Sequence, residues 1–345
     1  MQWLNPFRAV PNIMRAEEII EFAHRRSTRI STKSSLRLPR TERARIREIG
    51  RLQEFTRQVC TKLKEPVEGF PSLDHIHPFY YEMADLLVGI DDLKRALGAV
   101  YNCIPPIEEI SRKHIEAMKL AADYRQLKRT RSSAKGRISS IVRGTDSNLD
   151  VLIKSRAVLS RLPSISPEMP TVVVSGYPNV GKSTLVKSVS SAEPEVAYYP
   201  FTTRDVIVGH LEVDNKIVQF VDTPGLLDRP MANRNEIERK AIAALKYLAH
   251  VIVFMMDPSG TCGWELSEQL QLYSEIRRTF PLTPIVVVFN KVDITPEEQL
   301  NRAVALMPDA LKTVASDGVG IREVLNAALS RLGFERSNFP SREGH

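Results

Sequence analysis

The feature that most constrains this chain is the stretch from Gly176 to Thr184, which reads Gly-Tyr-Pro-Asn-Val-Gly-Lys-Ser-Thr. It follows an apolar run, Val172 to Val174, that is typical of a buried strand, and it leads into Leu185 to Val189, which indicates the start of a helix. A Gly-x-x-x-x-Gly-Lys-Ser pattern between a strand and a helix predicts a phosphate-binding loop. In such a loop the glycines permit a tight turn, so that backbone N–H groups and the helix N-terminus point at an anion.

The loop residues have distinct expected roles. Lys182 is expected to lie along the β- and γ-phosphates of a nucleotide, and the Ser183 hydroxyl is expected to bind Mg²⁺. The residues predicted to contact the phosphates are Asn179, Val180, Gly181, Lys182, Ser183 and Thr184. The loop alone does not indicate which base the nucleotide carries.

Two further segments predict the rest of a Mg²⁺ and γ-phosphate site. Asp222-Thr223-Pro224-Gly225 ends a predicted strand, so that the Asp222 carboxylate reaches Mg²⁺ through water and the Gly225 amide contacts the γ-phosphate. Between the loop and Asp222 lies the pair Thr202-Thr203, and a threonine in this place can bind Mg²⁺ while the γ-phosphate is present. The spacing favours Thr203 over Thr202 but does not decide between them.

The base is indicated by Asn290-Lys291-Val292-Asp293, which follows a predicted strand. A carboxylate at Asp293 can accept hydrogen bonds from the ring N–H and the exocyclic amine of guanine together, and adenine cannot return that pairing. Asn290 and Lys291 are expected to brace the loops and stack on the base. Ala315 and Ser316 follow the last predicted strand, where the Ala315 amide is placed to contact the guanine oxygen. The predicted ligand is therefore GTP or GDP with Mg²⁺.

The chain divides into two parts at Pro163 to Pro170, where three prolines in eight residues indicate a domain boundary. Residues 1–165 are expected to form a helical bundle, with helices near 13–26, 41–64, 80–99, 107–127 and 148–162. Residues 166–335 alternate short apolar strands with helices, which predicts an α/β domain with a mostly parallel sheet and one antiparallel strand. The expected strands are 171–175, 206–213, 216–222, 251–257, 284–290 and 311–315, and residues 336–345 are expected to be a short tail.

The charge is distributed unevenly between the two parts. Residues 1–165 carry a net charge of +11 and residues 166–345 a net charge of −4, which together make the total of +7. The basic half is expected to meet a polyanion, and the basic stretches 25–40 and 128–143 are the predicted RNA contacts. Three widely separated cysteines, no signal-peptide pattern and no apolar run of membrane-spanning length favour a cytoplasmic protein without a membrane partner.

With these residues in view, the chain resembles the nucleolar G protein (Nog) family of Obg-like GTPases, in a compact archaeal-type form. The resemblance covers nearly the whole chain and rests on the motifs above, on Asp222 to Pro230, on Arg234 to Ile242 and on Asp257 to Gly263. It implies a GTPase that acts in assembly of the large ribosomal subunit, with large-subunit rRNA, a ribosomal precursor particle and an activating partner. We expect a monomer when the protein is off the ribosome.

Hydrolysis is expected to be slow without a partner, because Leu226 follows Gly225 where Ras-like enzymes place a water-orienting glutamine. The residues expected to act in hydrolysis are Asn179, Lys182, Thr203 and Gly225. In related GTPases an asparagine at the position of Asn179 helps to bind K⁺, so K⁺ activation is a hypothesis here. Two other interpretations stay open: an RNA-binding scaffold whose nucleotide site is mainly structural, and a ribosome-linked Obg-like stress regulator.

Overall fold

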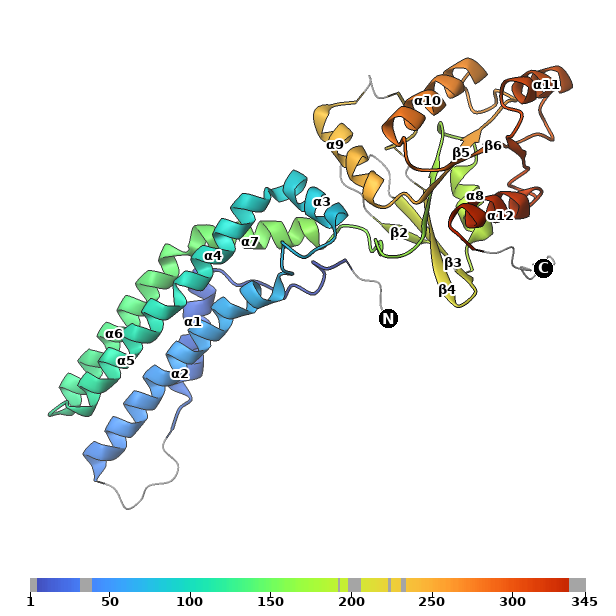
Figure 1. Cartoon of the computed structure of the whole chain (residues 1–345). Coiled ribbons are helices and arrows are strands. Elements are labelled where there is room, and N and C mark those ends of the chain that lie inside the picture. Colours follow the sequence, from blue (N-terminus) through green and yellow to red (C-terminus); the bar gives the residue numbers. More distant parts are fainter. Residues whose placement is uncertain are drawn as a thin grey trace. The chain divides into compact units, whose positions relative to one another are not determined.

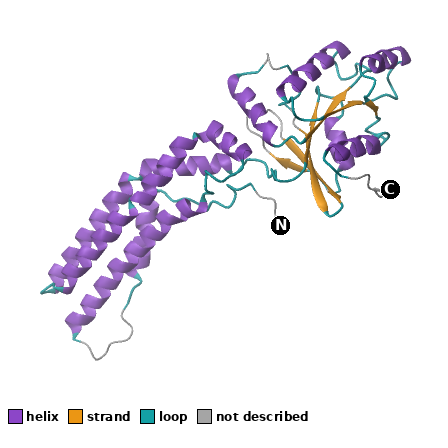
Figure 2. Cartoon of the chain, in the orientation of Figure 1, coloured by secondary structure: helices purple, strands orange, loops and turns teal. Residues whose placement is uncertain are grey.

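The computed structural model describes residues 5–31, 39–191, 193–197, 206–222, 225–230 and 234–334. The chain falls into two compact units. The helical unit comprises residues 6–76 and 88–160, and the sheet unit comprises residues 1–5, 77–87 and 161–345. Every strand in the described part of the chain belongs to the sheet unit (Figure 2). The domain boundary after residue 165 stays a prediction, because compactness does not test independent folding.

The helical unit is built from long amphipathic helices packed side by side (Figure 1). In α2, the buried residues Leu52, Phe55, Val59 and Leu63 recur every three or four positions and form an apolar stripe toward the neighbouring helices. The helices of the unit are α1 Ala16–Thr28, α2 Arg40–Gly69, α4 Ile90–Asn102, α5 Ile104–Lys119, α6 Tyr124–Gly144 and α7 Asp146–Leu159. The predicted helical bundle is confirmed.

Two of the predicted helices are wrong because each is interrupted. The helix expected over 80–99 is two helices, α3 Pro78–Val88 and α4, which are separated at Gly89 by its φ of 74°. The helix expected over 107–127 is also two, because the Asp123 side chain accepts a hydrogen bond from the Gln126 amide and caps the start of α6. The second break places the basic stretch 128–143 within α6.

A third predicted boundary is wrong in the opposite direction. The helix expected to end near residue 64 continues through Pro66 to Gly69. Proline fits the φ of a helix, and in the last turn its missing N–H costs only one backbone hydrogen bond. Pro66 is itself buried, so packing favours continuation of the helix.

The sheet unit has seven strands in the order β2-β3-β4-β1-β5-β6-β7. All neighbours are parallel except at β3, which is antiparallel to both β2 and β4. The strands are β1 Thr171–Ser175, β2 Glu195–Ala197, β3 Val206–Val213, β4 Lys216–Asp222, β5 Val251–Met256, β6 Ile285–Phe289 and β7 Leu311–Lys312. The mostly parallel sheet with one antiparallel strand is confirmed, although β2 was not predicted, because this three-residue edge strand has an exposed Val196.

Helices cover both faces of the sheet (Figure 1). The helices α8 Lys182–Val189 and α12 Ile321–Arg331 pack against each other on one face, and α10 Leu266–Thr279 packs against β5. The remaining helices of this unit include α9 Glu236–Ala244 and α11 Glu297–Leu306. No helix in the described ranges is long and apolar enough to cross a membrane. The carboxyl ends of the parallel strands meet at one edge, where ligands bind in sheets of this type.

Candidate nucleotide-binding site

The loop between β1 and α8 has the backbone geometry of a phosphate-binding turn. Gly176 and Gly181 have φ values of 136° and 106°, and Asn179 has a φ of 64°. A Cβ atom at Gly176 would lie 2.3 Å from the Met255 carbonyl oxygen, and one at Gly181 would lie 2.2 Å from Asn290 Nδ2. Both glycines are therefore required by conformation and by the close approach of the ends of β5 and β6.

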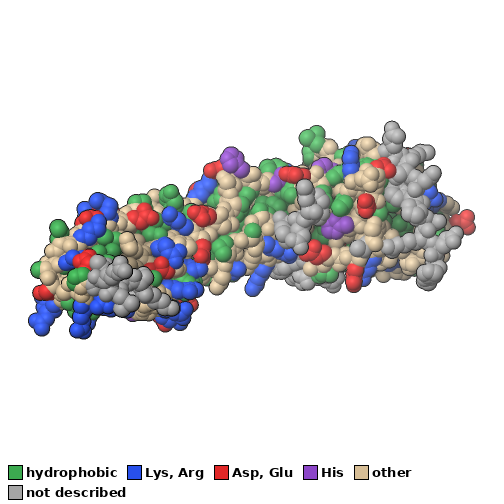
Figure 3. Space-filling view, turned by 90° about the horizontal axis from the view of Figure 1, so that it is seen from below, with side chains coloured by type: hydrophobic (Ala, Val, Ile, Leu, Met, Phe, Trp, Pro, Cys, Tyr) green, Lys and Arg blue, Asp and Glu red, His purple; other side chains and the backbone are tan. Residues whose placement is uncertain are grey.

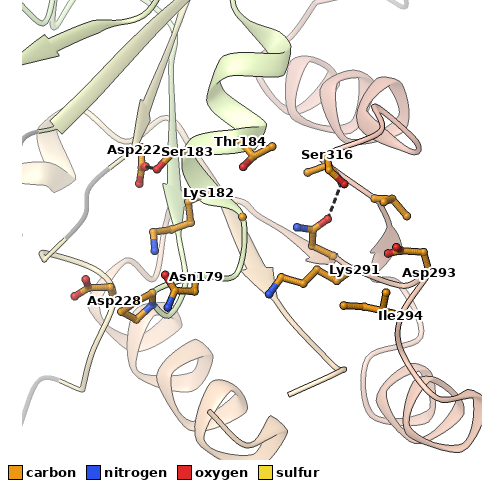
Figure 4. A pocket seen from close by; sticks show the side chains of 15 residues that line it. Asn179, Lys182, Ser183, Thr184, Asp222, Asp228, Lys291, Asp293, Ile294 and Ser316 are labelled. Atoms are coloured by element: carbon orange, nitrogen blue, oxygen red, sulfur yellow. Dashed lines mark hydrogen bonds between the residues drawn. The ribbon is translucent and has the colours of Figure 1, made fainter. Parts of the chain in front are cut away.

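This loop forms one wall of a cavity of about 500 Å³ at the carboxyl edge of the sheet (Figure 4). Residues separated by more than a hundred positions in the sequence line the same cavity. They include Asn179, Gly181, Lys182, Ser183, Thr184, Asp222, Asp228, Asn290, Lys291, Asp293, Ile294, Ala315 and Ser316. Most of the predicted site residues therefore lie together. Val180, which is buried, and Gly225 do not line the cavity, and Thr202 and Thr203 lie outside the described residues.

Lys182 and Ser183 make internal hydrogen bonds at the start of α8. The Lys182 ammonium donates to the carbonyl oxygens of Gly176 and Tyr177, at 2.9 and 2.8 Å. The Ser183 hydroxyl donates to Asp222 Oδ2 at 2.6 Å, which joins the phosphate loop to the end of β4. These bonds hold the lysine and the hydroxyl at the mouth of a helix whose N–H groups point into the cavity.

Ser183 and Asp222 form an oxygen-only pair that fits Mg²⁺. Asp222 is completely buried, and its Oδ1 atom has no hydrogen-bond partner among the described residues. Burial raises the pKa of the Asp222 carboxyl, and the nearby Lys182 and the Ser183 hydroxyl offset this only in part. A hard cation that prefers oxygen ligands would satisfy the free oxygen and stabilise the carboxylate.

The segment after Asp222 places an unpredicted carboxylate in the cavity. The Gly225 amide donates to Asp228 Oδ2 at 2.6 Å, and Arg234 lies 3.6 Å from the other oxygen of Asp228. Arg234 also donates to the Gly225 carbonyl oxygen and is almost fully buried. Leu226 is completely buried, and its aliphatic side chain has no group that could orient a water molecule.

The segment predicted to recognise guanine is held in place by Asn290. Its Nδ2 atom donates to the Val180 carbonyl oxygen at 2.8 Å, and its Oδ1 atom accepts from Thr313 Oγ1 and from the Ala315 amide. Asn290 thus ties the phosphate loop to the last loop, as expected for a brace. The Ala315 amide is occupied by this bond, and its contact with guanine stays a prediction.

A second brace was not predicted, although its sequence, Asp257 to Gly263, carried part of the family resemblance. The buried Asp257 carboxylate accepts from Lys291 Nζ at 2.8 Å and from the hydroxyls of Ser259 and Thr261. The adjoining Trp264 stacks on Tyr177 of the phosphate loop, with ring centroids 4.4 Å apart. Burial opposes ionisation of Asp257, but the hydrogen bonds from Lys291 and the hydroxyls prevail and lower its pKa.

The basic stretches of the helical unit lie mainly on helices. Residues 25–28 end α1, residues 32–38 lie outside the described part, and residues 128–143 lie on α6. Figure 3 shows Lys and Arg side chains over the helical unit, with acidic side chains among them. Several of these cations are exposed, whereas Arg131 and Lys135 are partly buried.

Comparison with known proteins defines the family. Residues 7–166 match the NOG1 N-terminal helical domain, and residues 236–293 match nucleolar GTP-binding protein 1 (NOG1). The chain is 36% identical to the uncharacterised protein MJ1408 of Methanocaldococcus jannaschii, over 86% of this chain and 83% of that protein. The chain belongs to the NOG1 family. The predicted family is thereby confirmed.

Other members of the NOG1 family are longer. The chain is 34% identical to nucleolar GTP-binding protein 1 of Caenorhabditis elegans, over 91% of this chain and 45% of that protein. It thus spans about half the length of the nucleolar relatives it matches. Among solved structures, the putative Plasmodium falciparum member is 34% identical with a TM-score of 0.43, covering 50% of this chain and 90% of that one. Era in complex with MgGDPNP and a 16S ribosomal RNA fragment is 27% identical with a TM-score of 0.36, covering 50% and 59%.

Proposed function

We propose that this NOG1-family chain is a GTP-binding switch that hydrolyses GTP slowly unless a partner activates it. Residues 166–335 serve as the GTPase domain, and residues 1–165 bind large-subunit rRNA during assembly of the large ribosomal subunit. The ligand is GTP or GDP with Mg²⁺. Ser183 and Asp222 hold the metal with one of Thr202 and Thr203, and Lys182, Gly225 and Asn179 act on the phosphates.

The observation that carries the proposal is the cavity that Asp293 shares with Lys182 and Ser183. These side chains come from segments more than a hundred residues apart, and the Asn290 side chain bonds directly to the phosphate loop. A base at Asp293 and phosphates at Lys182 would therefore occupy one continuous site. Mg²⁺, when bound, neutralises charge on the β- and γ-phosphates. The chain's own residues orient the nucleotide and supply the donors.

Guanine specificity is tested by exchanging the carboxylate for an amide. Asp293→Asn removes an acceptor for the guanine N–H groups, so we expect GDP affinity to fall at least about 100-fold. The same amide can donate to the 2-oxygen of xanthine, so XDP affinity is expected to rise. Calorimetric titration measures both. Asp309→Asn, an equal charge change at an exposed position outside the cavity, is the control.

Activation by K⁺ is part of the proposal because Asn179 lines the cavity in a left-handed conformation. A K⁺ ion held there would neutralise charge that develops on the phosphates, as an arginine would. Single-turnover hydrolysis is expected to be faster in KCl than in NaCl at matched ionic strength. The difference is expected to vanish in Asn179→Ala, and equal rates of the natural chain in both salts contradict this point.

A structural nucleotide site is the second candidate, since the buried Leu226 cannot orient water. Single-turnover GTP hydrolysis with and without large ribosomal subunits separates the two. A switch is expected to turn over faster on the particle, whereas a scaffold stays equally slow. RNA binding that weakens steeply with salt is expected in either case, because phosphate contacts dominate.

A further inference from the structure

A buried carboxylate surrounded by arginines lies where three helices of the helical unit meet. The helices α1, α2 and α6 pack against one another (Figure 1). Glu48 of α2 is completely buried at this junction. It accepts hydrogen bonds from Arg47 Nε at 3.3 Å, from Arg51 Nη1 at 3.0 Å and from Arg131 Nη1 of α6. One anion thus faces three guanidinium groups.

The donors of this cluster are not all used. The Nε atoms of Arg51 and Arg131 are buried and have no hydrogen-bond partner among the described residues, and the same is true of Arg43 one helical turn before Arg47. An unpartnered buried donor destabilises the folded state, and a charged one does so more strongly. The cluster is not sealed from solvent, since the side chains of Arg47, Arg51 and Arg131 are 36%, 28% and 18% exposed.

Lys135 adds a fourth cation to the same junction. Its ammonium donates to Ser27 Oγ of α1 and lies 4.7 Å from the centre of the Phe55 ring of α2. Burial, together with the charges of Arg131 and Arg51, lowers the pKa of Lys135 to about 8, and the charge of Glu48 offsets this only in part. His24 of α1 also faces the cluster, and burial, Lys135 and Arg131 lower its pKa.

A structural clamp between α2 and α6 would account for part of this arrangement. An ion pair that only joins two helices needs one cation for each carboxylate, with any carboxylate oxygen left over accepting another hydrogen bond. Among the described residues, Arg47, Arg51 and Arg131 pair with no carboxylate other than Glu48. With Lys135 the cluster therefore carries an excess of about three positive charges. The excess charge and the unused donors point to an anion from outside the chain.

We propose that this cluster, named here the Glu48 cluster, binds a backbone phosphate of RNA. The guanidinium fork matches phosphate oxygens, and bonds between charged groups of this kind are among the stronger ones in proteins. The proposal rests on the proposed RNA-binding role of the helical unit and assigns that role to particular residues. RNA is favoured over an acidic peptide because further cations continue along both helices: the exposed Lys128 lies one turn before Arg131 on α6, and Arg43 lies one turn before Arg47 on α2.

The proposal is tested by fluorescence anisotropy of the full chain with a fluorescein-labelled structured fragment of large-subunit rRNA. Arg51→Gln removes a cation of the cluster, and Arg95→Gln removes an exposed cation of α4 that pairs only with Asp92 among the described residues. We expect Arg51→Gln to weaken binding about 5- to 10-fold and to reduce the slope of log K against log salt by about 0.7–0.9. Equal effects of the two variants would overturn the proposal.

A second measurement gives the pKa of Lys135 in the natural chain. Because no residue of the cluster is changed, a folding defect cannot explain the result. Nuclear magnetic resonance of ¹³Cε-labelled lysine gives the pKa of Lys135 with and without the RNA, with Lys135→Met as the assignment control. A bound phosphate is expected to raise that pKa from about 8 toward the usual range. Binding that leaves it unchanged contradicts the proposal while leaving RNA binding by the helical unit intact.

Two further outcomes distinguish failure of the proposed RNA role from failure of the cluster proposal. Absence of any RNA binding by the natural chain would contradict the proposed RNA role itself, and the cluster proposal with it. In the remaining measurement, inorganic phosphate at 10-fold excess over the RNA phosphates replaces the RNA, and the Lys135 pKa is measured again. If it shifts the Lys135 pKa as far as the RNA does and Arg51→Gln leaves RNA affinity unchanged, the cluster is a free-phosphate site and the proposal is wrong.

Discussion

The sheet unit and the helical unit each bury a carboxylate completely, and the two carboxylates have opposite surroundings. Asp222 of β4 accepts one hydrogen bond, from Ser183, and has a free oxygen and a raised pKa. Glu48 of α2 accepts from three arginines, and the neighbouring Lys135 has a lowered pKa. The surroundings of Asp222 have too little positive charge, and those of Glu48 have too much.

The difference indicates the charge of the ligand that each unit accommodates. A raised carboxyl pKa marks a place where a cation would be favourable, and a lowered lysine pKa marks a place where an anion would be favourable. In the sheet unit this agrees with Mg²⁺ beside a nucleotide, and in the helical unit with a phosphate of RNA. A buried carboxylate thus supports two kinds of recognition, because its neighbours differ in the two units.

The largest effect is expected at Glu48. Glu48→Gln leaves three partly buried guanidinium groups without their anion, which is expected to destabilise the helical unit by about 3 kcal/mol, the lower end for a broken buried pair. Glu109→Gln on α5, where both members of the ion pair with Arg112 are exposed, is the control and should cost at most about 1 kcal/mol. Urea unfolding followed by circular dichroism measures both, and equal losses would show that Glu48 is not the centre of a charge cluster.

A smaller effect of opposite sign is expected at Asp222. In the nucleotide-free protein, Asp222→Asn removes a buried carboxylate that lacks a cation, so the melting temperature of the sheet unit is expected to rise by roughly 2–4 °C. Because folding raises the pKa of Asp222, its charge destabilises the natural protein increasingly as pH rises through that pKa. The gain in melting temperature should therefore be present at pH 7 and disappear at acidic pH. A lower melting temperature of the variant at pH 7 would contradict the claim that Asp222 lacks a cation.

Lys135 provides the corresponding test in the helical unit. Its lowered pKa means that the charged form destabilises the folded state below about pH 8, and that stability is regained as pH rises from there toward 10. Lys135→Met is expected to stabilise the unit at pH 7 by about 1 kcal/mol after solvent screening is allowed for. The gain over the natural chain should shrink by pH 9.5. Lys113→Met, at an exposed position, is the control in urea unfolding.

The smallest effect is expected at Asp228, which holds the amide predicted to contact the γ-phosphate. The Asp228 carboxylate and a γ-phosphate oxygen cannot both take the Gly225 N–H, and their charges repel. Asp228→Asn is therefore expected to raise GMPPNP affinity about 3- to 10-fold while leaving GDP affinity within about twofold. Fluorescent-nucleotide titration measures the ratio, and equal changes for both nucleotides would rule out competition at this amide.

Much of the sheet unit could be predicted, because its chemistry is local in the sequence. The pattern from Gly176 to Thr184 and the run Asn290 to Asp293 each carry their function in a few adjacent residues. The strands that position them are apolar runs, and β1, β3 and β4 match the predicted ranges. The brace from Asp257 to Lys291 was not predicted, because it joins residues 34 apart that no local pattern connects.

The helical unit could be predicted only in outline. Its apolar stripes predict helices, but whether a helix stops depends on single residues such as Gly89 and Asp123, which the stripe does not distinguish from their neighbours. The basic stretch on α6 was expected to contact RNA as a charged surface. That Arg131 instead points to Glu48, 83 residues away, follows from the packing of α2 against α6 and from nothing in the stretch itself.

We expect Asp222 to complete its charge balance with Mg²⁺ when a nucleotide is bound. The most direct measurement is the affinity of the full chain for fluorescent GMPPNP with Mg²⁺ and with EDTA, for the natural chain and for Asp222→Asn. Mg²⁺ is expected to strengthen binding at least about 10-fold in the natural chain and by less than about twofold in the variant. An equal gain from Mg²⁺ in both proteins would contradict the claim.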